Sequence, residues 1–345
     1  MTDDPFVAAI HGDGDVDDGP DLAPPLHTTT TFDRSSQDEL VYGRYHHVTR
    51  RRLEAVLGAL EGGIAITYPS GMAAISSLLR HLRPDRIALP DDVYYVTRQH
   101  VEAEAAHGAW ELGAPLVDSD VVWVETPSNP KCLVTDIAEV AGGEGTVVVD
   151  STFATPILQR PLDLGADFVV HATTKAINGH SDAMGGVVVT RDGAAAEALL
   201  AARDRDGTIP GSLETWLTLR GVRTLPLRAM RQSETASAVA EWLVDRVPTV
   251  WYPGLADHPG ADVASRQMRG PGGLLSFEMG GYEEAADVVR RLRVFRKATS
   301  LGGVESLVEH RREVDDGAPE GLIRLSIGLE SAESLVGDLD QALGG

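Results

Sequence analysis

The stretch VVHATTKAING, residues 169–179, combines an apolar run, a short polar turn and a lysine. Lys175 is one of only three lysines in a chain that is rich in arginine, so its position directly after a predicted strand needs an explanation. A continuous apolar run before such a turn indicates a strand that is buried on both faces, as in parallel sheets. The carboxyl ends of such strands are where open α/β sheets bind their ligands.

The same pattern recurs on both sides of this stretch. Short runs rich in valine and isoleucine predict strands at 64–68, 86–89, 121–125, 146–150, 167–172 and 185–190. Helices are predicted at 71–82 and across 50–63, where apolar residues share one face and Gly62 and Gly63 end the helix. This alternation predicts an α/β fold with a mainly parallel sheet and helices on both of its faces.

Three parts are expected along the chain. Residues 1–45 hold several prolines, aspartates and glycines with little periodicity, which predicts an extended amino-terminal arm that a partner surface orders. Residues 46–222 are expected to form the large domain, and residues 223–345 a smaller α+β domain. In the smaller domain, helices are predicted at 233–247, 283–295 and 331–343, and strands at 273–279 and 322–328.

Composition excludes several classes of function. A formal net charge of -22 argues against binding to nucleic acid or to anionic membranes, because both need a dense basic surface. No apolar run approaches the ~20 residues of a membrane span, and the amino terminus is acidic where a secretory signal begins basic. We therefore expect a cytoplasmic protein.

Cysteine and histidine give little sign of metal chemistry. The lone Cys132 cannot form an internal disulfide, and we interpret it as a packing residue with a redox role left open. His46, His47 and His180 have no further ligands at metal spacing, so we expect no metal and interpret them as structural.

Polar residues that follow the predicted strands form a chemically coherent set. Ser70, Gly71 and Met72 stand between a strand and a helix start, where free N–H groups and the helix dipole can hold a phosphate. The ends of the later strands carry Glu125 and Asn129, Asp150, and Thr174 with Lys175.

Together these residues suit pyridoxal 5'-phosphate (PLP). The phosphate would lie at residues 70–72, Asp150 would keep the ring nitrogen protonated, and Lys175 would condense with the aldehyde. A half-buried lysine near other cations loses its proton more readily, as this reaction requires. Each residue alone also has another interpretation: Lys175 as a solvated surface residue, Asp150 as a cap or turn residue, and the SGM turn as a helix start without a ligand.

Longer motifs extend the pattern to nearly the whole chain. They are AIHGD (9–13), PPLHTTTTF (24–32), YGR (42–44), LEAVLGALEGG (53–63), SGMAAI (70–75), DDVYY (91–95), ETPSNP (125–130), VVVDSTFATPILQRPLDLGAD (147–167), KAINGHSD (175–182), LRGVRTLPLR (219–228), YPGL (252–255), SLGGVESLVEH (300–310) and IRLSIGLE (323–330). With these motifs the chain resembles the Cys/Met metabolism family of PLP enzymes, which includes the cystathionine synthases and lyases and methionine gamma-lyase. The resemblance implies fold type I of the PLP-dependent transferases, the aspartate aminotransferase type, with a seven-stranded sheet in the PLP-binding large domain.

The resemblance also implies roles around the cofactor. Lys175 would bind the cofactor aldehyde and move protons between substrate carbons, and Asp150 would pair with the pyridinium. Tyr94 would stack on the ring and act as an acid or base at the leaving group. The phosphate would be bound by the N–H groups of Gly71 and Met72 and by the hydroxyl of Thr174.

Further roles concern the substrate and a partner subunit. Arg324 would clamp the substrate carboxylate bidentately, assisted by Asn129 and Ser300, with Thr299 beside them. Tyr42 and Arg44 would reach the phosphate of a neighbouring subunit. A homodimer or homotetramer with shared active sites is therefore expected.

Some positions depart from the family pattern. Ala172 stands where the family usually has a serine that donates to the phosphate, a loss of roughly 1.5 to 3 kcal/mol if nothing replaces the hydroxyl. Thr299 stands where many cystathionine enzymes have a glutamate that faces the distal ammonium of the substrate. Residues 311–321, RREVDDGAPEG, are shorter and more charged than the corresponding family segment.

These observations predict an enzyme that eliminates or replaces a group at the β or γ carbon of a sulfur-containing or O-acylated amino acid, with cystathionine gamma-lyase or gamma-synthase chemistry as the leading pair. One alternative is a specialised γ-replacement with a different nucleophile. Another is a family member that binds a ligand or partner without turnover.

Overall fold

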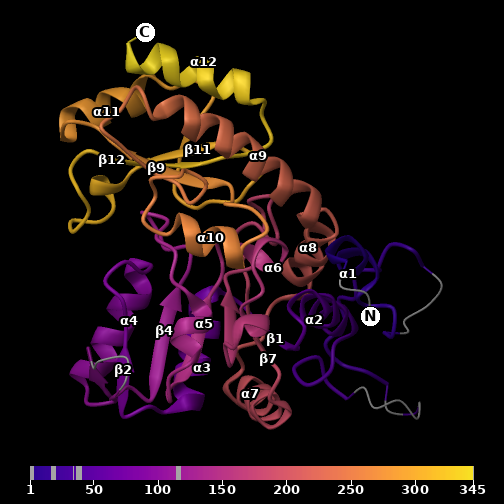
Figure 1. The fold of residues 1–345 in the computed structure, drawn as a ribbon. Coiled ribbons are helices and arrows are strands. Elements are labelled where there is room, and N and C mark those ends of the chain that lie inside the picture. The colour runs from indigo at the N-terminus through magenta and orange to yellow at the C-terminus, as the bar shows by residue number, and fades with distance from the viewer. Residues whose placement is uncertain (1–3, 17–20, 34, 36–40, 114–117, 345) are drawn as a thin grey trace.

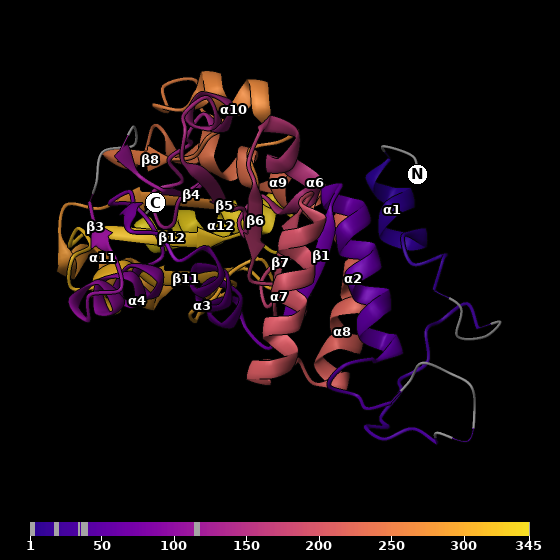
Figure 2. The same cartoon turned by 90° about the horizontal axis from the view of Figure 1, so that it is seen from below.

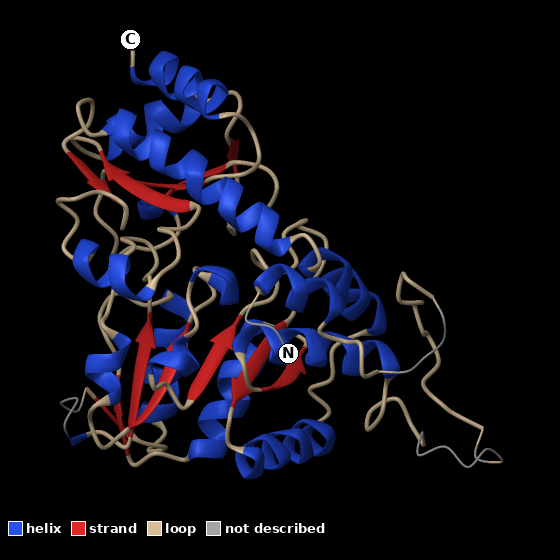
Figure 3. Cartoon of the chain, turned by 45° about the vertical axis from the view of Figure 1, so that its right-hand side comes forward, coloured by secondary structure: helices blue, strands red, loops and turns tan. Residues whose placement is uncertain are grey.

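Two β-sheets organise the protein. Its structure, a computed structural model, describes residues 4–16, 21–33, 35, 41–113 and 118–344. Figure 3 shows the strands in two groups, one above the other, with helices around both. The predicted α/β fold with a mainly parallel sheet is confirmed.

The larger sheet has seven strands in the order β1-β7-β6-β5-β4-β2-β3. Their bounds are β1 Ile64–Tyr68, β2 Arg86–Ala88, β3 Glu111–Leu112, β4 Val121–Glu125, β5 Thr146–Asp150, β6 Phe168–His171 and β7 Gly186–Thr190. From β6 to β3 all neighbouring strands are parallel, whereas β7 is antiparallel to both β1 and β6. The carboxyl ends of β1, β4, β5 and β6 therefore lie at one edge of the sheet, where Figure 1 shows the loops that face the smaller sheet.

Helices cover both faces of this sheet because its central strands are apolar on both sides. Val187 and Val189 pack on the face covered by α2 (Val48–Glu61), while Val188 packs on the face covered by α3 (Gly71–Leu82). The other helices of this part are α4 Tyr95–Ala106, α5 Ile137–Ala141, α6 Thr155–Leu158, η2 Pro161–Leu164, α7 Gly193–Asp206 and α8 Ser212–Val222.

The amino-terminal segment differs from the predicted extended arm. Pro5–His11 form a helix, α1, which Asp4 caps by accepting a hydrogen bond from the Phe6 N–H. α1 lies beside α2, as Figure 2 shows, and buries Ala8 and Ala9. Beyond it, a 2.7 Å ion pair between Asp13 and Arg52 fastens the chain to α2. A helix forms here because Ala8 and Ala9 join the apolar cluster that includes Leu53, Val56, Leu57 and Leu60 of α2. Parts of the predicted arm lie outside the described residues.

The smaller sheet has the order β10-β11-β12-β9-β8. Its strands are β8 Thr249–Trp251, β9 Leu274–Glu278, β10 Arg296–Lys297, β11 Leu307–His310 and β12 Leu322–Ser326. The elements around it are α9 Leu225–Leu243, α10 Ala261–Gln267, α11 Tyr282–Arg291, η3 Arg311–Glu313 and α12 Ala332–Leu343. The antiparallel pairing of β11 with β12 places Glu309 opposite Arg324.

Among the residues that the structure describes, no helix is long and apolar enough to cross a membrane.

Candidate active site

A pocket of about 370 Å³ lies between the two sheets. The larger sheet contributes residues that follow its strand ends, and the smaller sheet contributes residues of β11, β12 and the loop before β11. Most of the predicted site residues line this pocket: Gly71, Met72, Tyr94, Asn129, Asp150, Thr174, Lys175, Thr299, Ser300 and Arg324.

The start of α3 forms one end of the pocket. Ser70 caps this helix by accepting a hydrogen bond from the Ala73 N–H, so the amides of Gly71 and Met72 precede the first bond of the helix and remain for a ligand. A Cβ on Gly71 would lie 2.8 Å from the Cβ of Ala172, so only glycine lets the helix start approach the Ala172 turn this closely. Thr174 lies beside them, and its hydroxyl donates to the Gly185 carbonyl at 3.2 Å.

Asp150 ends β5 with its carboxylate buried in the pocket. Its Oδ1 accepts a 3.0 Å hydrogen bond from the Thr152 N–H. Burial raises the pKa of Asp150, and the Thr152 hydrogen bonds and the charge of His171 oppose that rise. A cation in front of this carboxylate would offset the cost of its burial.

Lys175 reaches the same pocket from the turn after β6. Its Nζ donates to Ser300 Oγ at 2.9 Å, a contact that joins the two parts of the chain. Burial, and secondarily the charge of Arg324, lowers the pKa of Lys175, while Glu309 acts in the opposite direction. The amine is therefore prepared to act as a nucleophile or base nearer neutral pH than an exposed lysine.

Arg324 is held by three groups around its guanidinium. Nη1 donates to Asn129 Oδ1 at 2.9 Å, and Nη2 donates to the Ser300 carbonyl at 2.8 Å and forms an ion pair with Glu309 Oε2 at 3.0 Å. Burial lowers the pKa of Arg324 to about 10, so the guanidinium stays charged near neutral pH. Ser300 has a φ of 81°, an unusual conformation that points its carbonyl and hydroxyl to Arg324 and Lys175 respectively.

Tyr94 stands at the start of α4 with its ring against Tyr95 in an edge contact, at a centroid distance of 5.1 Å. Its N–H donates to Glu125 Oε2 at 2.7 Å, which fixes the backbone at this point. Burial raises the pKa of the Tyr94 phenol. Burial and the nearby Asp150 raise the pKa of Glu125 well above its usual range, so this carboxyl holds a proton more readily than a free one.

Sequence reasoning assigned no role to Glu309 or Arg311, although both line the pocket. Glu309 Oε2 accepts a hydrogen bond from Arg311 Nη1 and forms an ion pair with Arg324 Nη2, so one carboxylate oxygen lies between two guanidinium groups. The sequence shows the charges but not this pairing, because the four-residue strand β11 was not predicted. The register of β11 against β12 is what brings Glu309 to Arg324.

Tyr42 and Arg44 do not line the pocket of their own chain. Arg44 donates to the Asp204 carbonyl at 3.3 Å and to the Tyr45 hydroxyl at 3.0 Å. The buried Arg50 holds the segment by donating at 3.1 Å to the carbonyls of Gly43, Arg44 and Tyr45. This anchorage fixes the YGR turn to the first turn of α2, and none of its three residues lines the pocket described here.

Two of the histidines considered as metal ligands make separate polar contacts. His47 Nε2 is 3.1 Å from Ser212 Oγ, and His180 Nδ1 is 2.7 Å from the Asn178 carbonyl. Within the part of the chain that the structure describes, no three histidine, cysteine or acidic side chains gather as metal ligands. Cys132 is buried and free.

The residues of the pocket fit PLP. At the start of α3, where only glycine fits at position 71, the N–H groups of Gly71 and Met72 can bind a phosphate. Asp150 offers a buried carboxylate that a protonated ring nitrogen would stabilise, and Lys175 offers an amine with a lowered pKa to an aldehyde. These three groups open into one pocket of sufficient size.

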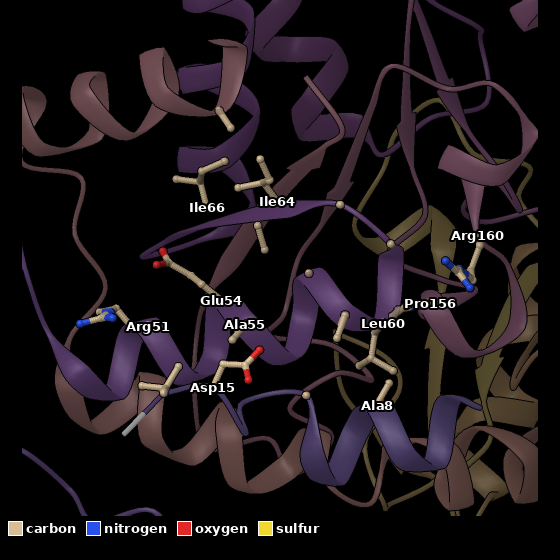
Figure 4. A pocket seen from close by; sticks show the side chains of 18 of the residues that line it. Ala8, Asp15, Arg51, Glu54, Ala55, Leu60, Ile64, Ile66, Pro156 and Arg160 are labelled. Carbon is tan, nitrogen blue, oxygen red and sulfur yellow. The ribbon is translucent and has the colours of Figure 1, made fainter. Parts of the chain in front are cut away.

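A second, larger hollow of about 830 Å³ lies among α1, α2, β1 and α7. Figure 4 shows its lining, with Leu60, Ile64 and Ile66 among the apolar residues and Arg51, Glu54 and Asp15 among the charged ones. It holds no lysine and none of the strand-end residues of the candidate site. The larger hollow is therefore not the candidate active site.

Comparison with known proteins gives relatives of one family. The family model described as Cys/Met metabolism PLP-dependent enzyme matches residues 8–344. Cystathionine gamma-synthase of Mycobacterium tuberculosis is 42% identical, covering 93% of this chain and 91% of that protein. Cystathionine beta-lyase of Coxiella burnetii is 37% identical, covering 92% of each.

A solved structure is similar over almost the whole chain. It is cystathionine gamma synthase from Xanthomonas oryzae pv. oryzae in complex with aminoacrylate and cysteine, with a TM-score of 0.94 and 37% identity. The similarity covers 99% of this chain and 98% of that one.

Proposed function

The chain belongs to the Cys/Met metabolism family of PLP-dependent enzymes, and on this premise we propose that it eliminates a group at the β or γ carbon of an amino acid or replaces one at the γ carbon. As a member of this family it is a PLP-dependent enzyme, a carbon–sulfur lyase or γ-substituting transferase. The group that leaves is sulfur or an acylated hydroxyl in our proposal. The convergence of Lys175, Asp150 and Arg324 in one pocket is the observation that carries it.

PLP, when bound, supplies an aldehyde that condenses with amines and a ring that stabilises negative charge on the substrate's α carbon. In this proposal, Lys175 Nζ holds the aldehyde and then carries protons to and from the substrate carbons. Asp150 holds a proton at the ring nitrogen. The N–H groups of Gly71 and Met72 at the start of α3 bind the phosphate, and the Thr174 hydroxyl rotates from the Gly185 carbonyl to donate to it.

In the same proposal, Arg324 binds the substrate's α-carboxylate. Its guanidinium is charged, buried and fixed by Asn129 and the Ser300 carbonyl, so little side-chain entropy is lost when a carboxylate binds. Tyr94 exchanges a proton with the leaving group, and Thr299 lines the substrate's path. A substrate fixed at one end by Arg324 presents its α proton to Lys175 next to Ser300.

A substrate panel tests the proposed reaction. PLP-loaded protein is incubated with L-cystathionine, L-methionine and O-acyl-L-homoserines, with and without L-cysteine, and products are identified by mass spectrometry. Ammonia and a 2-oxo acid indicate elimination, and a new amino acid in the presence of cysteine indicates replacement. Absence of turnover on every member of the panel, by protein that has taken up PLP, would refute the proposal.

The proposal includes an assembly. Tyr42 and Arg44 act on the phosphate of a neighbouring subunit, so the enzyme is a homodimer or a homotetramer with shared sites. Their distance from the pocket of their own chain, and the anchorage of this turn by Arg50, favour such a role. We retain residues 1–45, 46–222 and 223–345 as the proposed division into an arm, a large domain and a small domain.

A cytoplasmic location remains part of the proposal. The buried free thiol of Cys132 fits a reducing compartment.

A further inference from the structure

One cation of the pocket has no part in the reaction proposed above. Arg311 is the first residue of η3, directly after β11, and it lines the same pocket as Lys175 and Arg324. Its side chain is only 5% exposed. A buried guanidinium in a pocket needs acceptors, so its contacts show what else it could bind.

Among the described residues, the Arg311 side chain uses only one of its N–H donors in a hydrogen bond. Nη1 donates to Glu309 Oε2, and Nη2 lies 4.0 Å from Asp315 Oδ2. Nε is buried and has no acceptor among the described residues. Glu309 is itself shared, because the same oxygen forms an ion pair with Arg324 Nη2 at 3.0 Å. A single carboxylate oxygen therefore serves two guanidinium groups.

No acidic residue of the described pocket lining is available for a positively charged substrate end. The three that line it are Glu125, Asp150 and Glu309. Glu125 accepts from the Tyr94 N–H and Asp150 from the Thr152 N–H, and Glu309 lies between the two arginines. Beyond the groups assigned to the cofactor and to the α-carboxylate, the pocket thus offers donors from Arg311 and no free carboxylate.

Tyr94, Arg311 and Arg324 all line this pocket. Burial raises the pKa of the Tyr94 phenol, and the two charges that oppose this rise are those of Arg311 first and Arg324 second. In the proposed function Tyr94 acts at the leaving group. With Arg324 assigned to the α-carboxylate and Lys175 to the cofactor, Arg311 is the remaining cation of the described pocket lining for the far end of the substrate's side chain.

We propose that Arg311 determines specificity by binding a carboxylate at the far end of the substrate's side chain, so that amino acids ending in a carboxylate are preferred over those ending in an ammonium. The inference rests on the proposed function, since it takes Arg324 as the α-carboxylate site. Thr299, a neutral residue in the pocket lining, adds no charge that would favour a distal ammonium.

Binding of amino acids without a leaving group tests this separately from turnover. The probes are L-2-aminoadipate, L-norleucine and L-lysine, whose distal ends are a carboxylate, a methyl and an ammonium. Their dissociation constants for the PLP-loaded protein are measured by isothermal titration and by the change in cofactor absorbance. We expect aminoadipate to bind about tenfold or more tighter than norleucine, and lysine more weakly than either.

Variants test whether Arg311 causes the preference for a distal carboxylate. Arg311→Gln should bring the aminoadipate-to-norleucine ratio close to one while norleucine binding changes by no more than about threefold, and Arg311→Lys should keep part of the preference. Arg312→Gln is the matched control, because Arg312 neighbours Arg311 in η3 but does not line the pocket. It should leave the ratio unchanged.

Two results would overturn the inference: an unchanged ratio in Arg311→Gln, or lysine binding to the wild type as tightly as aminoadipate. The second comparison needs no variant, so a poorly folded Arg311→Gln does not remove the test. A protein that shows the preference but turns over no panel substrate would refute the proposed function alone.

Discussion

Lys175 Nζ donates a 2.9 Å hydrogen bond to Ser300 Oγ, across the junction between the two sheets. The carbonyl of the same serine accepts from Arg324 at 2.8 Å. One residue with an unusual backbone conformation therefore sets the distance between the amine proposed for chemistry and the guanidinium proposed for the substrate.

The cofactor should attach to Lys175 alone. Borohydride reduction of PLP-loaded protein, followed by proteolysis and mass spectrometry, should place the adduct on the peptide that contains Lys175. The other lysines are internal controls: Lys131 lies 5.5 Å from the ring centroid of Trp251, and Lys297 pairs with Glu313 at 2.7 Å. Neither lines the pocket. A stoichiometric adduct on one of these, with none on Lys175, would contradict the assignment.

Replacing Arg324 should weaken substrate capture and spare the cofactor. For Arg324→Ala we expect kcat/KM to fall by about 10- to 100-fold, mostly through KM, because a charge-assisted bond contributes roughly 1.5 to 3 kcal/mol. The absorbance of bound PLP should persist, since Arg324 lies among substrate-side residues. Arg324→Lys keeps the charge without the bidentate fork and should recover only part of the loss. Loss of the cofactor absorbance in Arg324→Ala would show that the residue has been given the wrong role.

Capture of PLP by cofactor-free protein should depend on pH through Lys175. The reaction needs the neutral amine, and burial with the charge of Arg324 lowers the pKa of this lysine. The rate should therefore rise with pH and reach half of its maximum below the 10.5 of an ordinary lysine.

Two variants test the direction in which each neighbouring charge shifts the pH midpoint of PLP capture. Arg324→Ala removes a like charge and should move the midpoint up, and Glu309→Gln removes an opposite charge and should move it down. Burial remains in both, so both midpoints should stay below that of an exposed lysine. Stopped-flow absorbance measures the rates. Shifts in the same direction for the two variants would contradict this electrostatic account.

Ala172→Ser should tighten PLP binding if the missing hydroxyl is what limits it. A hydroxyl that donates to the phosphate contributes roughly 1.5 to 3 kcal/mol, which corresponds to a dissociation constant at least about tenfold lower. Equilibrium dialysis against PLP measures it. An unchanged constant would mean that the phosphate does not lie against Ala172.

Gly71→Ala should weaken PLP binding, because its Cβ would lie 2.8 Å from that of Ala172 and displace the start of α3. PLP affinity should fall by about tenfold or more. Gly193→Ala is the control, since a Cβ at the start of α7 meets nothing within 4 Å. Equal PLP affinity in the two glycine variants would argue against a phosphate at residues 70–72.

Mixed subunits should reveal shared sites. Lys175→Ala and Arg44→Ala homo-oligomers should each be impaired, whereas mixed oligomers should regain activity because one type of site then has both residues intact. Native mass spectrometry verifies the mixing. Verified mixed oligomers without regained activity would count against action of Arg44 on a neighbouring subunit.

Much of the larger sheet was predictable from local pattern. β1 and β4 agree with the predicted runs to the residue, because continuous valine and isoleucine runs between turns indicate strands buried on both faces. The helix predicted at 71–82 also agrees, since Ser70 caps it and its apolar residues face the sheet. These elements carry their own signal in neighbouring residues.

The remaining elements depend on contacts that a sequence does not display. β11 is short, contains Glu309 and His310, and is a strand because it pairs with β10 and β12. α1 was predicted as extended chain because its signal is a seven-residue helix that α2 stabilises by packing. The junction of Glu309 with two arginines was missed for the same reason as β11.

The location of the pocket between the two sheets divides its tasks between two stretches of chain. Groups proposed to hold the cofactor come mainly from the stretch between β1 and the turn after β6, whereas β11 supplies Glu309 and the two arginines come from η3 and β12. Grafting the β11–β12 stretch of a relative onto this chain would thus exchange substrate preference and leave the cofactor chemistry in place. Ser300 contacts both Lys175 and Arg324, so such a chimera has to preserve both of these contacts.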